Sequence, residues 1–217
     1  MARKQKSSES QPDPAGEGAV ATAQRGRPPG DHASKRAKLL EAAATVIAAE
    51  GYAKATMRRV AEHAGYTTGA VTYYFANKED MVLALVTGRF DRYDAMLEAI
   101  RDTTDVRELL AQWFQLGRGA KFWPLMPELL TSARSEPRIA ELIAGRYAKF
   151  RADYAAVLAT AQARGLVRDD IPPDVLSDQL SAMGDGWALL YPIEPDRFTS
   201  AQASALIDAT LTLISPR

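Results

Sequence analysis

The sequence predicts an all-α protein of about nine helices, because its apolar residues recur at helical spacing in one segment after another. The run from Arg138 to Arg164 is the longest such segment, with apolar residues three and four positions apart. Glycines that favour a left-handed turn follow several of these segments directly, among them Gly51, Gly65 and Gly165. No segment alternates apolar and polar residues between turn signals, as a strand would.

The composition is that of an ordinary globular protein with ample apolar material for a core. The chain has 217 residues, which suggests one large domain or two small ones, and 47% of them are hydrophobic. It contains no cysteine, which excludes a disulfide framework, a thiolate metal site and a thiol nucleophile. It has neither an apolar signal region nor a run of about 20 apolar residues that could span a bilayer. We therefore expect a cytoplasmic protein without a membrane partner.

Charge is distributed unevenly along the chain. Lysine and arginine together balance aspartate and glutamate at 27 each, so the formal net charge is zero. Between Arg25 and Lys78, however, cations outnumber anions nine to four. Such an asymmetry is typical of a DNA-reading end joined to a domain that does not touch DNA.

Residues 1–33 are predicted to form a disordered basic tail, because they are rich in Ser, Pro, Gly and charge and nearly lack bulky apolar side chains. The tail contains Arg25-Gly26-Arg27-Pro28. Two interpretations stay open for Arg25 and Arg27. They could enter a narrow A·T-rich minor groove, or the tail could touch phosphates only loosely.

Residues 34–80 are predicted to form a three-helix unit. Its first helix extends from Ser34, a reasonable N-cap, to Glu50. The second begins at Thr56 and ends before Gly65, and the third extends from about Thr68 to Phe75. The predicted core of the unit consists of apolar residues from all three helices, namely Leu40, Val46, Ile47, Val60, Val71 and Phe75.

The junction between the second and third helices has the residues of a helix-turn-helix. Gly65 stands where the chain must turn sharply and where a positive φ is least costly for glycine. Thr67 then offers a hydroxyl to cap the next helix. This arrangement usually places its second helix in the major groove of DNA.

Residues 81–217 are predicted to form a second, purely helical domain for ligand binding and dimerisation. Asn77 is expected to cap a long helix that ends near Ile100, and a short helix broken up by Pro124 and Pro127 is expected further on. A further helix is expected to end near Ala120. The last three expected helices extend from Arg138 to Arg164, from Asp174 to Tyr191, and from Ser200 to Ile214.

Residues 35–85 resemble the tetracycline-repressor (TetR) family of bacterial transcription regulators. The resemblance rests on LLEAAATVIAAEGYAKATMRRVAEHAG followed by YTTGAVTYYFANKEDMVLALV. Further on, Ala163-Arg164-Gly165-Leu166 and MGDGWALL at 183–190 are similar to the branch that contains the choline-responsive repressors. The chain departs from the family in its long N-terminal tail and in Thr68-Gly69, which suggests few direct base contacts from the third helix.

The resemblance implies a homodimeric repressor that binds a palindromic double-stranded DNA operator and leaves it when an unidentified small-molecule effector binds. It also implies a bacterial, cytoplasmic protein that is associated with the nucleoid when bound. Two alternatives stay open: an activator or ligand-independent DNA-binding regulator, and a helical small-molecule-binding protein without a DNA function.

The candidate DNA contacts combine cations, hydroxyls suited to phosphate oxygens, and small residues that let the backbone approach. They are Arg25, Arg27, Thr56, Arg58, Thr67, Thr68, Gly69, Ala70, Thr72, Tyr73, Tyr74 and Lys78. Arg58 and Arg59 stand early in a helix, which is a poor place for cations without a nearby anion. Either could instead be solvated, and one of Tyr73 and Tyr74 is expected to pack inward. A phosphate contact for Lys78 is implied by the family resemblance.

The candidate ligand-binding residues are bulky side chains in the second domain, for which plain core packing is the alternative. They are Trp113, Phe114, Trp123, Met126, Tyr147, Phe150, Tyr154 and Trp187. The aromatic faces among them could also hold a cation. The predicted dimer surface consists of apolar residues from the last two helices, namely Leu176, Leu180, Met183, Trp187, Leu206, Ala209 and Leu213. Asp185 repeats with other polar positions and is expected at a rim or in solvent.

The chain shows no constellation of residues that predicts catalysis. No carboxylate pair, no nucleophile with its base and no cluster with metal-ligand spacing is visible in the sequence. The only histidines are His32, in the predicted tail, and His63, which is expected to be solvated or to pack on a turn. The sequence therefore predicts no enzyme activity, no cofactor and no metal.

Overall fold

The computed structural model describes residues 29–118 and 125–216. Within these ranges it consists of nine α-helices and one short 3-10 helix, without strands, which confirms the all-α prediction. The helices are α1 (Pro29–Glu50), α2 (Met57–Ala64), α3 (Thr68–Tyr74), α4 (Lys78–Ile100), α5 (Val106–Arg118), α6 (Leu125–Ala133), α7 (Pro137–Ala163), α8 (Pro173–Leu190), η1 (Pro195–Phe198) and α9 (Ser200–Ile214).

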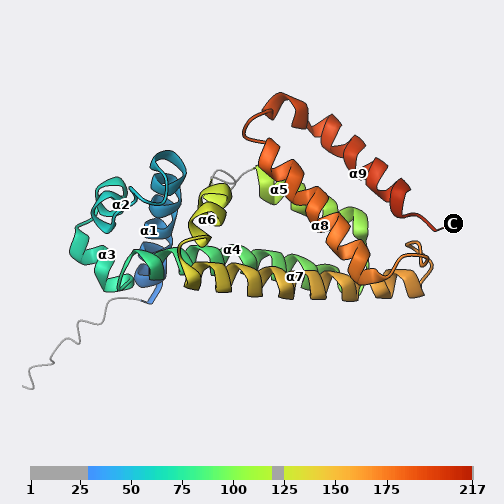
Figure 1. Ribbon diagram of the computed structural model, residues 1–217, viewed down its shortest axis with the longest axis horizontal. Helices are drawn as coiled ribbons and strands as arrows, with labels where there is room; N and C mark the ends of the chain where they lie inside the picture. The colour runs from blue at the N-terminus through green and yellow to red at the C-terminus, as the bar shows by residue number, and fades with distance from the viewer. Residues whose placement is uncertain (1–28, 119–124, 217) are drawn as a thin grey trace, which may run out of the picture.

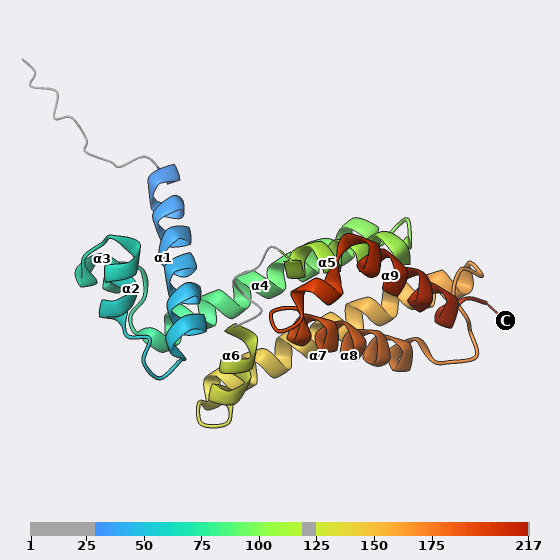
Figure 2. The same cartoon turned by 90° about the horizontal axis from the view of Figure 1, so that it is seen from above.

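The molecule is elongated, with a small head of three helices at one end and a helical bundle at the other (Figures 1 and 2). Helices α1 to α3 form the head, and the long helix α4 leads from the head into the bundle. There α4 packs along α7, α7 packs against α8, and α5 packs against α9. Helix α6 contacts both α1 and α7, so it is a second connection between the head and the bundle.

The local signals of the head are confirmed in detail. The Thr56 hydroxyl accepts a hydrogen bond of 3.2 Å from the backbone nitrogen of Arg59, and the Thr67 hydroxyl accepts one of 3.2 Å from Ala70. Gly65 ends α2 in the left-handed conformation, with φ of 71°. These contacts fill the donors left open at the first turns of α2 and α3 and set the turn between them.

The first helix is longer than predicted. It begins at Pro29, so Ser34 lies inside the helix instead of capping it, and residues 29–33 are not part of a disordered tail. The ion pair of 3.0 Å between Asp31 and Lys35 stabilises this extra turn, and a carboxylate suits the positive end of a helix. Arg25 and Arg27 lie outside the described residues.

The predicted core of the head is correct except at one position. Val46, Ile47, Val60, Val71 and Phe75 are all buried. Leu40, however, is only half-buried, whereas its neighbour Leu39 is 1% exposed. At this turn of α1 the core residue is therefore Leu39 and not the predicted Leu40, whereas Val46 and Ile47 are buried as predicted.

Helix α4 is tied to its neighbours at both its start and its middle. Asn77 caps it as predicted, accepting a bond of 2.8 Å from the backbone nitrogen of Asp80. On the facing helix α7, Arg146 bonds to Asp91 at 2.7 Å and to Asp94 at 3.2 Å. Arg146 has 19% of its side chain exposed, so this bridge is better shielded than an ordinary surface pair. It joins α4 and α7 into one structural unit.

Candidate nucleic-acid interface and internal cavity

Helix α3 presents one face to solvent and buries the other. Val71 and the C-terminal Phe75 are buried in the head and fix the rotation of the helix. The opposite face exposes four of the predicted DNA contacts, namely Thr68, Gly69, Thr72 and Tyr73. Ala70 and Tyr74 are half-buried. An exposed helix of this kind, supported by a second helix behind it, has the shape that enters a major groove.

An aromatic cluster joins the start of α1 to the end of α3. The His32 ring lies 4.6 Å from the Tyr74 ring and 5.8 Å from the Tyr73 ring, measured between centroids. Tyr74 is half-buried in this cluster, while Tyr73 is 73% exposed. The expectation that one of the two tyrosines packs inward therefore applies to Tyr74. The role of His32 was missed because the residue was assigned to the tail.

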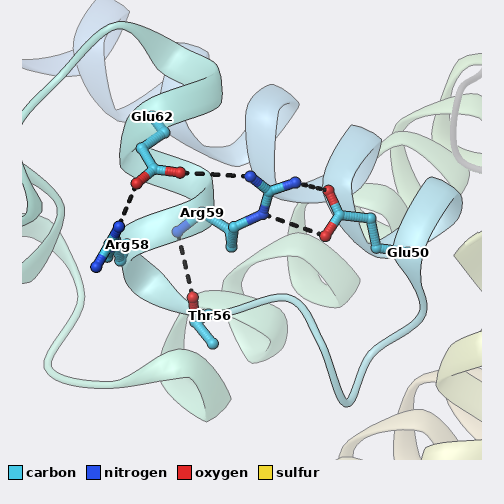
Figure 3. Close-up of polar contacts among 5 residues, drawn as sticks. All are labelled: Glu50, Thr56, Arg58, Arg59 and Glu62. Atoms are coloured by element: carbon cyan, nitrogen blue, oxygen red, sulfur yellow. Dashed lines mark hydrogen bonds and ion pairs between the residues drawn. The ribbon is translucent and has the colours of Figure 1, made fainter.

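The two arginines of α2 have anionic partners within the protein (Figure 3). The Arg58 Nε bonds to Glu62 at 2.8 Å. Arg59 lies between two carboxylates and bonds to Glu50 at 3.2 Å and Glu62 at 3.4 Å. These bonds lower the pKa of Glu50 and Glu62 and raise the pKa of both arginines.

These pairs correct the inference that cations at the start of α2 imply phosphates in front of them. The carboxylates of Glu50 and Glu62 already supply the missing negative charge. Arg58 nevertheless keeps 80% of its side chain exposed, so it can exchange Glu62 for an external anion. Arg59, held by two carboxylates, is less free to do so.

Lys78 lies at the junction between the head and α4. Its Nζ donates a hydrogen bond of 3.0 Å to the backbone oxygen of Tyr52 and lies 4.0 Å from the centroid of the Tyr52 ring. The loop after α1 is thereby attached to the first residue of α4. The contact leaves Lys78 half-buried, so a phosphate would share the ammonium group with the Tyr52 carbonyl.

The bundle encloses a small cavity between α4, α5, α7 and α8. Its volume is about 30 Å³, room for little more than one water-sized group. The residues that line it are mostly aromatic or aliphatic, namely Phe90, Tyr93, Met96, Leu109, Leu110, Trp113, Tyr147, Phe150, Tyr154, Leu180, Ser181, Gly184, Asp185 and Trp187.

Five of the eight predicted ligand-binding residues line this cavity, namely Trp113, Tyr147, Phe150, Tyr154 and Trp187. Phe114 does not, because its ring is buried against Trp187 with centroids 5.0 Å apart. Met126 is also buried elsewhere, in α6, and Trp123 lies outside the described residues. The lining residues of α4 were missed because nothing in its sequence shows which turn of a long helix faces a cavity.

Asp185 lies in the cavity wall and not at a solvent-exposed rim, which corrects the prediction. Burial raises the pKa of its carboxyl from 3.8 to about 6, against the opposing influence of a hydrogen bond from Tyr147 and the charge of Arg151. Burial and the neighbouring carboxylate in turn raise the pKa of the Tyr147 hydroxyl. A half-buried carboxylate with a raised pKa among aromatic side chains is the type of group that serves a binding site.

The rotation of α8 explains this correction. Leu176, Leu180, Gly184 and Ala188 form its buried face, with Asp185 next to it. A side chain cannot be accommodated easily at Gly184, because an added Cβ would lie 3.1 Å from the Trp113 ring. The close approach of α5 to α8 therefore depends on glycine at this position.

The predicted dimer residues do not share one surface. Leu176 and Leu180 are buried within the subunit, which removes them from any interface. Met183, Trp187 and Leu206 are half-buried, and Met183 packs on Thr210 of α9. Ala209 is exposed and Leu213 is 65% exposed. On α8, the large apolar residues that do face solvent are Val175, Leu189 and, just beyond the helix, Ile193.

Within the described residues, no cluster of histidine, aspartate and glutamate could hold a metal ion. None of the helices in the described ranges has the length and apolar character required to cross a membrane.

A helix-turn-helix head with an exposed recognition helix, joined through one long helix to a bundle with an apolar cavity, defines a class of DNA-binding regulator. Residues 39–85 match the model "Bacterial regulatory proteins, tetR family", and residues 91–215 match "BetI-type transcriptional repressor, C-terminal". The chain belongs to the TetR family and is a DNA-binding transcriptional regulator. Such regulators are not enzymes, in agreement with the prediction.

Similar proteins support this assignment across most of the chain. The repressor Rv1474c of Mycobacterium tuberculosis is 29% identical over 157 residues, which span 72% of this chain and 82% of that protein. The repressor AcnR of Corynebacterium diphtheriae is 30% identical over 159 residues, which span 70% and 78% respectively. The solved structure of the ketosteroid regulator KstR2 of M. tuberculosis superposes with a TM-score of 0.67 at 25% identity, covering 84% of this chain and 96% of that one.

Proposed function

We propose that this regulator is a homodimeric repressor that leaves a palindromic operator when a small molecule binds in the cavity of the bundle. The observation that supports this proposal is the course of α4. At its first residue, Lys78 is bonded to the head, and about three to five turns later Phe90, Tyr93 and Met96 line the cavity. A ligand that displaces these side chains therefore acts on the helix that positions the head.

The head of the proposed repressor comprises residues 34–80, and residues 81–217 bind the ligand and the second subunit. On the operator, the exposed face of α3 enters the major groove, with Arg58 and Lys78 on flanking phosphates. The arginines of the N-terminal arm add contacts beside them. The dimer forms through exposed apolar residues of α8 and α9, and it acts on DNA in the cytoplasm.

Release follows from geometry in this proposal. A palindrome requires the two recognition helices to be about 34 Å apart, one turn of the double helix. Because Arg146 joins α4 to α7, opening of the cavity moves α4 together with its bundle partner. The two heads then no longer match successive major grooves, so the affinity for the operator falls while each head stays folded.

The experiment is an electrophoretic shift with the DNA upstream of the protein's own gene, at several salt concentrations. We expect sequence-selective, salt-sensitive binding to that DNA, and a loss of about tenfold or more on Lys78→Ala. Lys54→Ala removes the same charge from an exposed position of the head and is the matched control. Absence of selective binding, or equal binding by Lys78→Ala and Lys54→Ala, would contradict the proposed interface.

A further inference from the structure

Three polar side chains of the cavity lining come from two adjacent helices. Asp185 and Ser181 stand one turn apart on α8, and Tyr154 lines the same cavity from α7. Tyr93 and Tyr147 also line it, but their hydroxyls already bond to Arg89 and Asp185. The Tyr154 hydroxyl and the Ser181 Oγ are both buried, and neither has a hydrogen-bond partner among the described residues. Buried hydroxyls normally have partners, so two open ones beside a carboxylate indicate a place for a polar ligand group.

The charge of this polar corner is negative. Asp185 is the only charged residue among those that line the cavity in the described part of the chain. Two arginines lie behind the lining, and each already has a partner. Arg151 of α7 bonds to Asp178 at 3.0 Å, and Arg89 of α4 donates to the Tyr93 hydroxyl at 3.0 Å. The cavity thus offers a carboxylate that no lining cation neutralises.

We infer that the effector is a protonated amine carried on an apolar, preferably aromatic, body. The inference rests on the proposed function only in taking the cavity as the effector site. The ammonium group binds Asp185 through a charge-assisted hydrogen bond and donates its remaining hydrogens to Ser181 and Tyr154. The body packs among Trp113, Trp187 and the other rings, whose faces also favour a positive charge.

The same features exclude other classes of effector. A carboxylate or phosphate would be repelled by Asp185, and no lining cation would compensate for the loss of its hydration. A neutral alcohol could use the two hydroxyls but would leave the carboxylate without a charged partner. A protonated amine offers both the positive charge that the carboxylate lacks and hydrogen-bond donors for the two open hydroxyls.

The size of the cavity shows how such a ligand must act. A volume of about 30 Å³ holds an ammonium group but not an aromatic body. Binding therefore separates the side chains around the cavity. Trp113 and Trp187 are the candidates to move, because both are half-buried and Trp113 lies directly against Gly184. Ligand binding consequently changes the fluorescence of these tryptophans.

The test is a titration of tryptophan fluorescence in the full-length protein with four related probes. They are phenethylamine, its N,N,N-trimethyl derivative, phenethyl alcohol and phenylacetate, all at neutral pH. We expect the amine to bind at least about tenfold more tightly than the alcohol, and phenylacetate not to bind. In Asp185→Asn the preference for the amine should vanish, whereas affinity for the alcohol should change less than about twofold. Asp174→Asn, which removes an exposed carboxylate from the same helix, should behave as the wild type.

Several results would overturn the inference. They are no binding of the amine at millimolar concentration, equal affinity for amine and alcohol, or an amine preference that survives in Asp185→Asn. Equal affinity for the trimethyl derivative, which has no N–H group, would overturn the role of Ser181 and Tyr154. Operator binding is measured separately by electrophoretic shift. Amine binding that leaves the operator complex intact would contradict ligand-controlled repression and not the recognition of the amine.

Discussion

A single partly buried side chain, Asp185, makes an unfavourable contribution to folding stability at neutral pH. The folded state holds the proton of this carboxyl more tightly than the unfolded chain does, since its pKa is about 6 instead of 3.8. The contribution of Asp185 to folding stability is therefore greatest below about pH 4 and is lost as the pH rises to about 7. Tyr147 and Arg151 face the carboxyl and reduce this effect without cancelling it.

We accordingly predict that Asp185→Asn stabilises the protein at pH well above 6. The gain should be about 2–3 kcal/mol in the free energy of unfolding, because the substitution removes the buried charge and keeps the shape. Urea unfolding at about pH 5 and about pH 8 measures it. The variant should lose most of the pH dependence of the wild type over this interval. If the free energy of unfolding falls equally in the wild type and in Asp185→Asn over this pH interval, groups other than Asp185 control the pH dependence.

Glu62 determines how available the arginines of α2 are to DNA. It holds Arg58 and shares Arg59 with Glu50. Glu62→Gln should increase operator affinity about two- to fivefold, because DNA phosphates then no longer compete with this carboxylate for Arg58. Electrophoretic shifts at several salt concentrations measure the change. Glu98→Gln makes the same change in charge at the far end of α4 and should leave the operator affinity unaltered. An equal gain in operator affinity in this variant would show that only the net charge of the protein matters.

At the scale of elements, the contact between α5 and α8 depends on one missing side chain. A Cβ at Gly184 would lie 3.1 Å from Trp113, whereas one at Gly145 on α7 would meet nothing within 4 Å. Alanine in a helix is otherwise better than glycine by about 1 kcal/mol. Alanine at position 145 therefore reports the effect of helix propensity alone, whereas alanine at position 184 reports helix propensity together with the clash with Trp113.

We predict that Gly145→Ala raises the free energy of unfolding by up to about 1 kcal/mol. The free energy of unfolding of Gly184→Ala should be about 1–2 kcal/mol lower than that of Gly145→Ala. Urea unfolding measures both, and the fluorescence titration with phenethylamine shows whether the cavity has narrowed. Equal stabilisation by the two substitutions would mean that the Trp113 ring of α5 can move away from position 184 without a cost in stability.

At the scale of the whole molecule, the proposed function requires two subunits. A single helix-turn-helix makes few base contacts, and symmetric pairing on a palindrome multiplies them. The exposed apolar residues of the last two helices, among them Leu189 of α8 and Leu213 of α9, are available for this pairing. Neither of the two lines the cavity.

The combined substitution Leu189→Glu and Leu213→Glu should therefore yield a folded monomer. Both side chains are more than half exposed, so neither change should unfold the subunit. Light scattering should report the monomer mass, circular dichroism an unchanged helix content, and electrophoretic shifts a loss of operator affinity of about a hundredfold or more. A variant that remains dimeric would place the interface elsewhere.

The sequence by itself determined the helices and most of their ends, the start of α1 excepted. The caps at Thr56, Thr67 and Asn77 and the turn at Gly65 are all present as predicted. Each of them depends on hydrogen bonds and backbone angles within a few residues, so the local sequence suffices to specify them. The same locality explains why the helix-turn-helix and its exposed face could be predicted.

Tertiary structure alone decided which face of each helix meets which neighbour. Helix α8 has apolar residues on more than one side, so its periodicity could not show that Leu180 and Asp185 face the cavity. Nor could the sequence show that Arg59 meets Glu50, nine residues away and on another helix. Such contacts depend on how helices rotate and cross, which is set by the packing of the whole bundle and not by any one segment.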